Sequence, residues 1–569
     1  MRLLRRSSPA QPPTTSLAPT SLASRSGQRR RLALQGLAAA SAAAAIFVTA
    51  SGCGPVEVDA NQGAATADNS PQPDQPDQPD QPDPSPSPSP SPDAVRPSPD
   101  GSGDIGPVPE GFEDFYSQTV TWEPCGGGFE CATIQAPLSW QDPALGTIDI
   151  ALNRRHARVQ PMGSILVNPG GPGGSGISFL TSAWTTFGDE LRDNFDIVGF
   201  DPRGVGQSTP VQCMDDAGKN IFIAASFPNT PEGIEEATAL AQEWAQACYD
   251  NTGLFLGHVD TQSVARDMDL IRALLGERYL DFLGFSYGTI LGAAYAGLFP
   301  GNVGHFVLDS AVDITLTSAE RGLAQAIGFE NTLRTYVEDC MQDVCPLTGS
   351  VDDGMEQIAA IFQAALDNPF PTSSGRVLTQ TMALYGVAVT LYDDMSWPFL
   401  TMALAEIVEE GTADILLWLA DFYFDREPDG SFSSNSLEVF LAVGCMDSPP
   451  FTPEEQAQFA ADVAAYAPTW SPLFAGGVSS CHFWNFPAVS WDFDNTAPGT
   501  GPIVVIGVTG DPATPFDGAI ALADTLEGGV LVTFDGEGHG AYGRSNMCII
   551  DAVDTFFVTG VAPAHGLVC

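Results

Sequence analysis

The chain has 569 residues, of which 70 are acidic and 22 are basic, and its formal net charge is −48. A surface with this charge repels nucleic acid and argues against any polyanion as the partner. At this length, a single compact core requires insertions or unstructured tails.

The N-terminal segment has the three-part plan of an export signal. Three arginines at 29–31 precede an apolar run at 32–50, and small residues then lead to Cys53. This arrangement predicts a bacterial lipoprotein signal over residues 1–53, in which Cys53 takes lipid and becomes the new N-terminus. A plain signal peptide and an uncleaved anchor are the alternatives, because the apolar run is just long enough to span a bilayer. We therefore expect an exported protein, lipid-anchored at the outer face of a bacterial membrane or secreted.

Residues 54–110 are rich in Pro, Asp, Gln and Ser, with Gln-Pro-Asp and Ser-Pro repeats at 72–92. Almost none of these side chains can be buried, so the composition predicts a disordered stalk that is stiffened by proline and by like-charge repulsion. After a lipid anchor, such a stalk would hold a folded body away from the membrane.

Strand patterns begin after the stalk. Residues 132–138 and 148–152 alternate like an antiparallel pair, whereas 164–167 and 196–200 are continuous apolar runs. Continuous apolar strands separated by helices are typical of a parallel sheet that is buried on both faces. The pattern therefore predicts an α/β domain with a mostly parallel sheet.

Residues 313–495 have helical patterns instead, and we expect a large helical cap inserted into the sheet domain. Strand patterns return at 502–508 and 529–534. The core of the sheet domain is therefore predicted in two segments, 111–312 and 496–569. The helices expected in the cap are 318–341, 351–367, 379–393, 396–410, 413–423 and 453–466.

Residues 280–299 carry the pattern of a nucleophile elbow. An apolar strand runs into Gly-Phe-Ser-Tyr-Gly at 284–288 and then into a helix of small residues. In such a turn the serine is strained and the strand and helix are pressed together, which explains the two glycines. The pattern predicts Ser286 as a nucleophile.

A serine nucleophile needs a histidine as base and a carboxylate that orients the histidine, in the chain order Ser, acid, His. Of the six histidines, only His539 lies in a glycine-rich turn after a late strand, so it is the predicted base. Asp511 ends the preceding strand, just before a proline, and is the predicted acid. Asp535 is its rival, but it lies only four residues from His539.

Attack on a carbonyl forms an oxyanion, which needs backbone N–H donors. We expect one donor to be the amide of Tyr287, next to the nucleophile, and the other to be the amide of Gly171. Gly171 lies in the loop 168–176, which reads Asn-Pro-Gly-Gly-Pro-Gly-Gly-Ser-Gly. A phosphate-binding loop is the competing interpretation, but the lysine of a P-loop and the spacing of a dinucleotide fingerprint are absent.

Eleven cysteines are present, and ten remain if Cys53 carries lipid. They fall in close sequential pairs, which favours five local disulfides, although other pairings also fit the sequence. The expected bonds are Cys125–Cys131, Cys213–Cys248, Cys340–Cys345, Cys445–Cys481 and Cys548–Cys569. No Cys or His cluster has metal-ligand spacing, so we expect neither a metal nor another cofactor.

Six segments together resemble the secreted tripeptidyl aminopeptidase family. Its members are α/β-hydrolases related to proline iminopeptidases. The resemblance implies a serine exopeptidase with Ser286, Asp511 and His539 as its triad. It also implies that Asp201 and Arg203 brace a loop near the active site and are not catalytic. The matching segments are 168–176, 199–208, 284–288, 307–309, 510–512 and 538–540.

The expected activity is therefore release of short peptides, tripeptides in this family, from the free N-termini of peptide substrates through an acyl-enzyme. A carboxylesterase, lipase or cell-envelope protease on the same fold is the first alternative. A catalytically silent, wall-associated binding protein is the second.

The group that binds the substrate's amine is not transferred by the resemblance, because the cap is too dissimilar to align. Four acidic residues of the cap are candidates, although a solvated helix face is the ordinary interpretation of each. They are Glu406, Glu409, Glu410 and Asp447.

Overall fold

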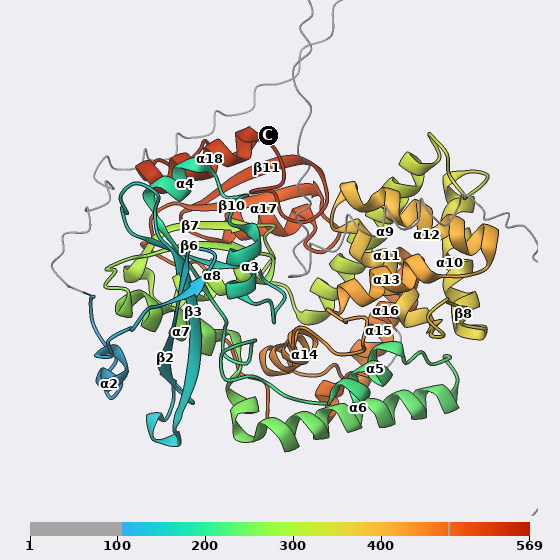
Figure 1. The fold of residues 1–569 in the computed structure, drawn as a ribbon, viewed down its shortest axis with the longest axis horizontal. Helices are drawn as coiled ribbons and strands as arrows, with labels where there is room; N and C mark the ends of the chain where they lie inside the picture. Colours follow the sequence, from blue (N-terminus) through green and yellow to red (C-terminus); the bar gives the residue numbers. More distant parts are fainter. Residues whose placement is uncertain (1–104, 476–477) are drawn as a thin grey trace, which may run out of the picture. The chain divides into compact units, whose positions relative to one another are not determined.

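The computed structural model describes residues 105–475 and 478–569 (Figure 1). The predicted signal peptide, Cys53 and nearly all of the predicted stalk lie outside these residues. In the part of the chain that is described, no helix is both long and apolar enough to cross a membrane.

A ten-stranded sheet has the order β1-β2-β3-β5-β4-β6-β7-β10-β11-β12. The pairs among β1, β2, β3 and β5 are antiparallel, and every pair from β5 to β12 is parallel. The predicted mostly parallel sheet is therefore confirmed. The strands are β1 Glu123–Gly126, β2 Phe129–Pro137, β3 Thr147–Arg155, β4 Ser164–Asn168, β5 Asp196–Phe200, β6 Leu280–Phe285, β7 Val303–Asp309, β10 Ile503–Gly510, β11 Gly529–Glu537 and β12 Leu567–Val568.

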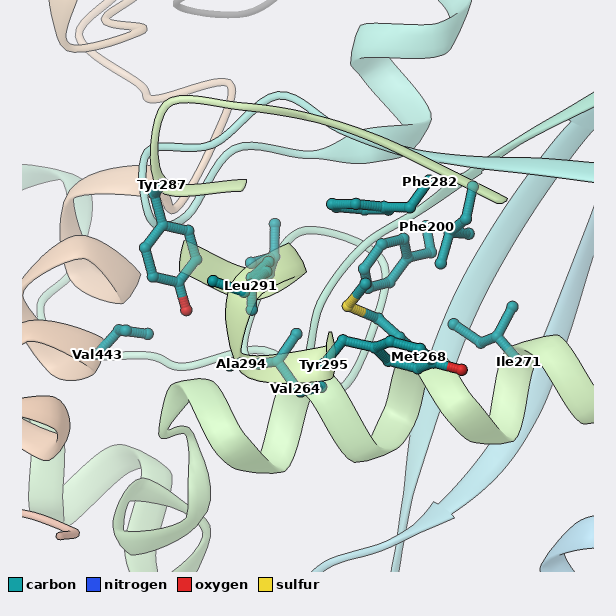
Figure 2. Packing of buried hydrophobic residues seen from close by; sticks show 14 of the residues in the cluster. Phe200, Val264, Met268, Ile271, Phe282, Tyr287, Leu291, Ala294, Tyr295 and Val443 are labelled. Atoms are coloured by element: carbon teal, nitrogen blue, oxygen red, sulfur yellow. The ribbon is translucent and has the colours of Figure 1, made fainter. Parts of the chain in front are cut away.

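Helices cover both faces of this sheet, which explains why its central strands are continuous apolar runs. One face packs on α3, α4 and α18, and the other packs on α7, α8 and α17. Figure 2 shows the second face, where Met268 of α7 and Leu291 of α8 lie near Phe282 of β6. The helices are α3 Gly176–Ala183, α4 Asp189–Asn194, α18 Met547–Thr559, α7 Thr261–Leu274, α8 Tyr287–Leu298 and α17 Phe516–Thr525.

Most helices between β7 and β10 pack around a second apolar cluster, which includes Leu333, Val387 and Leu416. The structure also contains α14, Ser436–Asp447, which was not among the predicted helices. Its apolar residues occur on all sides, so its sequence lacks a helical period. The other long helices between β7 and β10 are α9 Ser318–Cys340, α10 Val351–Asp367, α11 Gln380–Leu391, α12 Trp397–Glu410, α13 Asp414–Tyr423 and α15 Pro453–Tyr466.

The α14 helix packs on the sheet domain and not on the second apolar cluster. Val439 and Val443 belong to the same cluster as the sheet residues, and Val443 lies near Tyr287 in Figure 2. Conversely, Ile223 of α5 (Asp216–Ala224), from the segment before the elbow, packs in the second cluster. One helix of the insertion therefore packs with the sheet domain, and one helix of the sheet domain's segment packs with the insertion.

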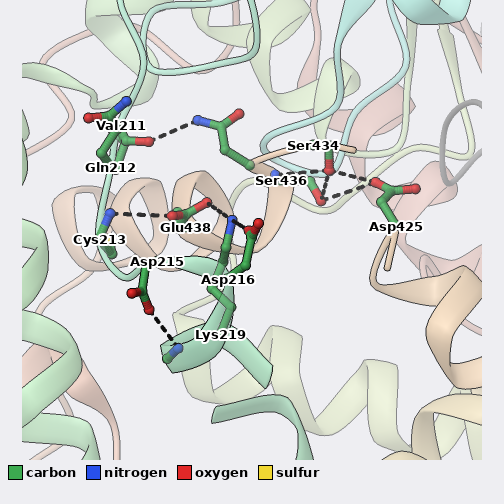
Figure 3. A network of polar contacts seen from close by, with 12 residues as sticks. Val211, Gln212, Cys213, Asp215, Asp216, Lys219, Asp425, Ser434, Ser436 and Glu438 are labelled. Carbon is green, nitrogen blue, oxygen red and sulfur yellow. Dashed lines mark hydrogen bonds and ion pairs between the residues drawn. The ribbon is translucent and has the colours of Figure 1, made fainter. Parts of the chain in front are cut away.

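A polar network attaches α14 to the segment that follows β5 (Figure 3). Lys219, the chain's single lysine, lies 3.4 Å from Asp216 and 3.7 Å from Glu438 of α14. Glu438 also accepts the N–H of Cys213 at 3.3 Å. Asn435, just before α14, donates to two backbone carbonyls of the same segment. These contacts hold the beginning of α14 against the sheet domain.

Five disulfide bonds occur among the described residues, and they join the same cysteines that the sequence spacing pairs. Such bonds form and persist in oxidising compartments and are rare in the cytosol. The bonds are Cys125–Cys131, Cys213–Cys248, Cys340–Cys345, Cys445–Cys481 and Cys548–Cys569.

Arg203, in the loop after β5, is completely buried. Its guanidinium group forms two hydrogen bonds with the carboxylate of Asp267 on α7, at 2.6 and 2.7 Å. It also donates to the backbone carbonyls of Pro137, Leu138 and His258. This buried pair connects a loop at the carboxyl end of the sheet to the helix that precedes the elbow.

The substitution Arg203→Ala should lower the free energy of unfolding by about 3–5 kcal/mol, because Asp267 would remain buried without its partner. The measurement is the urea unfolding curve. The control is Arg334→Ala, which removes an exposed pair with Asp352 and should change stability by about 0.5 kcal/mol or less. Equal effects of the two substitutions would contradict this account.

Candidate active site

Ser286 lies at the junction of β6 and α8 with φ 56° and ψ −122°. This conformation is strained for a residue that has a Cβ atom. The two flanking glycines allow the close packing, since a Cβ atom on Gly284 would lie 2.6 Å from the carbonyl oxygen of Gly288. A Cβ atom on Gly288 would lie 3.0 Å from the carbonyl oxygen of Asn168, at the end of β4. The geometry is that of an elbow, which projects the serine side chain beyond the sheet.

The structure brings His539 and Asp511 into direct contact. Nδ1 of His539 lies 2.9 Å from both carboxylate oxygens of Asp511. Asp511 also accepts the N–H groups of Ala513 and Thr514 and the hydroxyl of Thr514, each at 2.9 Å. Burial opposes ionisation of Asp511, but the charge and hydrogen bond of His539 and the amide of Thr514 hold its pKa below the usual value. The carboxylate therefore stays ionised and can orient the imidazole.

The end of β7 connects the loop of the predicted base to the elbow. The N–H of Ser286 donates to the carbonyl of Asp309 at 2.9 Å. The carboxylate of Asp309 and the hydroxyl of Ser310 accept the amides of residues 540–542 at 2.7–3.1 Å. No hydrogen bond joins Ser286 directly to His539 within the described ranges. The bonds at the end of β7 link their two segments. Asp309 belongs to one of the segments that carry the family resemblance, but its sequence context implies no role for it.

The glycine-rich loop after β4 contacts the elbow. Gly170 has φ +94°, and a Cβ atom there would lie 2.9 Å from Cβ of Ser286 and 3.0 Å from the nitrogen of Tyr287. The amides of Gly171 and Tyr287, the two predicted oxyanion donors, donate to no acceptor in the described part of the chain. An oxyanion donor requires such an N–H group without an internal acceptor.

Two helices of the insertion contact the loops of the acid and the base. Thr332 and Gln325 of α9 donate to the backbone carbonyls of residues 510 and 513, on either side of Asp511. Just after α11, the carbonyl of Tyr392 accepts the N–H of His539 at 2.8 Å, and the two rings meet edge to face at 5.3 Å. The sequence carried no signal for these contacts, because they join segments more than one hundred residues apart.

Asp535, the rival acid, is exposed and accepts the hydroxyl of Thr509 at 3.0 Å. Its carboxylate forms no hydrogen bond with His539 among the described residues. The geometry around His539 therefore favours Asp511 as the acid.

Within the described residues, no group of three or more His, Cys, Asp or Glu side chains is arranged to hold a metal ion.

Comparison with known proteins relates the whole folded region to one family. The family model described as TAP-like protein matches residues 467–569. The serine protease Hip1 of Mycobacterium tuberculosis is 34% identical over 80% of this chain and 92% of its own length. The chain belongs to the tripeptidyl aminopeptidase-like family of α/β-hydrolases.

Other members of the family are similar over nearly the same region. Carboxylesterase B of Mycobacterium tuberculosis is 36% identical over 77% of this chain and 86% of its own length. The tripeptidyl aminopeptidase of Streptomyces lividans is 29% identical over 79% of this chain and 86% of its own length. The predicted family and reaction class are confirmed, and the protein is a serine hydrolase.

The substitution Asp511→Asn should lower kcat about 10⁴-fold with little change in KM, because an amide cannot hold the imidazole in the required tautomer. The measurement is steady-state hydrolysis of an activated substrate. The matched control is Asp535→Asn, the exposed neighbour of the same loop region, which should retain wild-type kcat. Loss of activity in the control and not in Asp511→Asn would reverse the assignment.

The substitution Gly170→Ala should lower kcat roughly 10²–10³-fold, because its methyl group would displace the loop that carries an oxyanion donor. The control is Gly111→Ala, which has a similar φ of +87° but open space around the added methyl group. Both substitutions carry the backbone cost of a left-handed residue. If kcat falls equally in both variants, backbone strain and not displacement of the loop is responsible.

Proposed function

We propose that this protein is an exported aminopeptidase that releases short peptides, specifically tripeptides, from the free N-termini of peptide substrates. The observation that carries the proposal is the hydrogen bond between the ionised carboxylate of Asp511 and Nδ1 of His539. The loop of His539 is in turn hydrogen-bonded to Asp309, next to the strand that carries the strained Ser286. The names of two relatives, serine protease and tripeptidyl aminopeptidase, also support peptides as the substrates.

In the proposed mechanism, Ser286 attacks the scissile carbonyl and His539 takes its proton, while Asp511 orients the imidazole. The amides of Gly171 and Tyr287 stabilise the oxyanion. His539 then protonates the leaving amine, which is the N-terminus of the shortened peptide. Water, activated by the same histidine, hydrolyses the acyl-enzyme and releases the short peptide.

The proposed location is the outer face of a bacterial membrane, or the medium. Five disulfides support export, since such bonds are rare in the cytosol. The signal pattern of residues 1–53 supports it independently. We propose that Cys53 carries the lipid and that the proline-rich residues 54–110 tether the enzyme to it.

An esterase is the second candidate function, because a relative at 36% identity is named carboxylesterase B. The same triad geometry hydrolyses esters and amides, so the fold cannot separate the two substrate classes. Hydrolysis of short acyl esters, compared with tripeptide anilides, distinguishes them.

Digestion of a peptide library with the purified protein should release N-terminal tripeptides, which mass spectrometry of the products detects. The control is Ser286→Ala, in which release should fall by about 10⁶-fold, to background. Ester hydrolysis without any peptide release would overturn the aminopeptidase proposal in favour of the esterase. Failure of the wild-type protein to react with a fluorophosphonate would instead support a silent binding protein.

A further inference from the structure

Asp447, the last residue of α14, lies close to the elbow. Its carboxylate accepts the N–H of Thr261 at 2.9 Å and the hydroxyl of Thr261 at 2.5 Å. The same hydroxyl lies 2.6 Å from the phenol oxygen of Tyr287, which directly follows Ser286. One tyrosine side chain and two hydrogen bonds therefore connect the residue after the nucleophile to this carboxylate.

Asp447 has no ion-pair partner in the described residues. Arg321 of α9 is the positive charge that influences it, but the guanidinium group of Arg321 donates to the carbonyl of Leu316. Burial raises the pKa of Asp447 to about 7. A carboxylate offers about four acceptor positions, and Thr261 occupies two of them. The residue is half-buried, and the two remaining acceptor positions can accept a further donor.

The other acidic candidates of the insertion have different surroundings. Glu406 accepts the hydroxyl of Thr412 and the backbone amides of residues 414 and 415, at the start of α13. Glu409 and Glu410 lie exposed at the end of α12. None of these contacts reaches the elbow, and Asp447 differs from them in its hydrogen-bond connection to Tyr287.

We infer that Asp447 binds the α-ammonium group at the free N-terminus of a peptide whose scissile carbonyl lies at Ser286. This inference rests on the proposed aminopeptidase function and assigns its amine-binding group. An ammonium ion supplies both the missing countercharge and additional hydrogen-bond donors. Three extended residues span roughly 10 Å, so a carboxylate at a fixed place beyond the elbow limits the length of the released peptide. The same contact would therefore explain why three residues are released.

The contact requires an ionised carboxylate, which gives it a pH dependence. The groups that face Asp447 are Asp260, just before α7, Thr261 of α7, Tyr287 of α8 and Arg321 of α9. Below pH about 7 the free enzyme holds Asp447 protonated and unable to pair with an ammonium group. KM for peptides with a free N-terminus should therefore rise as the pH falls through this range. Peptides with an acetylated N-terminus lack this effect, so the ratio between the two substrates isolates it.

The experiment compares kcat/KM for one tripeptide anilide with a free and with an acetylated N-terminus, in the full-length enzyme. The wild-type enzyme should favour the free N-terminus roughly tenfold to a hundredfold, as expected for hydrogen bonds to a charged group. Asp447→Asn should reduce this ratio to about one, whereas Asp447→Glu should restore most of the preference. The control Glu409→Gln, on an exposed helix face, should keep the wild-type ratio. Fluorophosphonate labelling gives the concentration of active sites in each preparation.

A wild-type ratio in labelled Asp447→Asn would overturn the inference and leave the proposed function intact. Absence of any preference for free N-termini in the wild-type enzyme would overturn both. If Asp447→Asn does not fold, the pH dependence of the wild-type ratio decides. A ratio that falls on acidification below pH about 7 supports the inference, and a ratio that is constant between about pH 5.5 and 8 overturns it.

Discussion

The hydrogen bonds of Asp309 are the interaction on which the active-site geometry depends. Its backbone carbonyl binds the amide of Ser286, and its carboxylate binds two amides of the loop that carries His539. Burial raises the pKa of this carboxyl to about 6, so its position is costly and the backbone amides offset that cost. A single residue at the end of β7 therefore links two segments more than 250 residues apart in the chain.

The helical insertion supports the catalytic groups from the opposite side. Contacts from α9 hold the carbonyls around Asp511, and the end of α11 binds the amide of His539. The α14 helix packs with the sheet domain and presents Asp447 beside the residue that follows the nucleophile. The insertion is thus part of the active-site structure and not only a cover over it. The loops of Asp511 and His539 are therefore held by helices of the insertion as well as by the sheet.

Acidic residues have three different roles in this molecule, and the surroundings of each carboxylate decide the role. Asp511 is buried but ionised, because an imidazole and an amide stabilise its charge. Asp447 forms no ion pair within the described residues, and burial of its carboxyl raises its pKa to about 7. Asp535 is solvated and bonded to a threonine hydroxyl. The large acidic excess of the composition therefore says little about which carboxylate acts in the chemistry.

The sequence by itself determined most strands of the sheet, the elbow at Ser286 and the candidates Asp511 and His539. These depend on local patterns: apolar periodicity, glycines that relieve a strained turn, and polar residues at strand ends. The role of α14, the contact of Tyr392 with His539 and the difference between Asp447 and Glu409 were decided only by the tertiary structure. The apolar residues of α14 have no clear period, so the local pattern did not predict this helix. The contacts join segments far apart in the chain, so local patterns could not predict them either. Burial and missing countercharge are properties of the packed molecule, because the surrounding groups come from several elements at once.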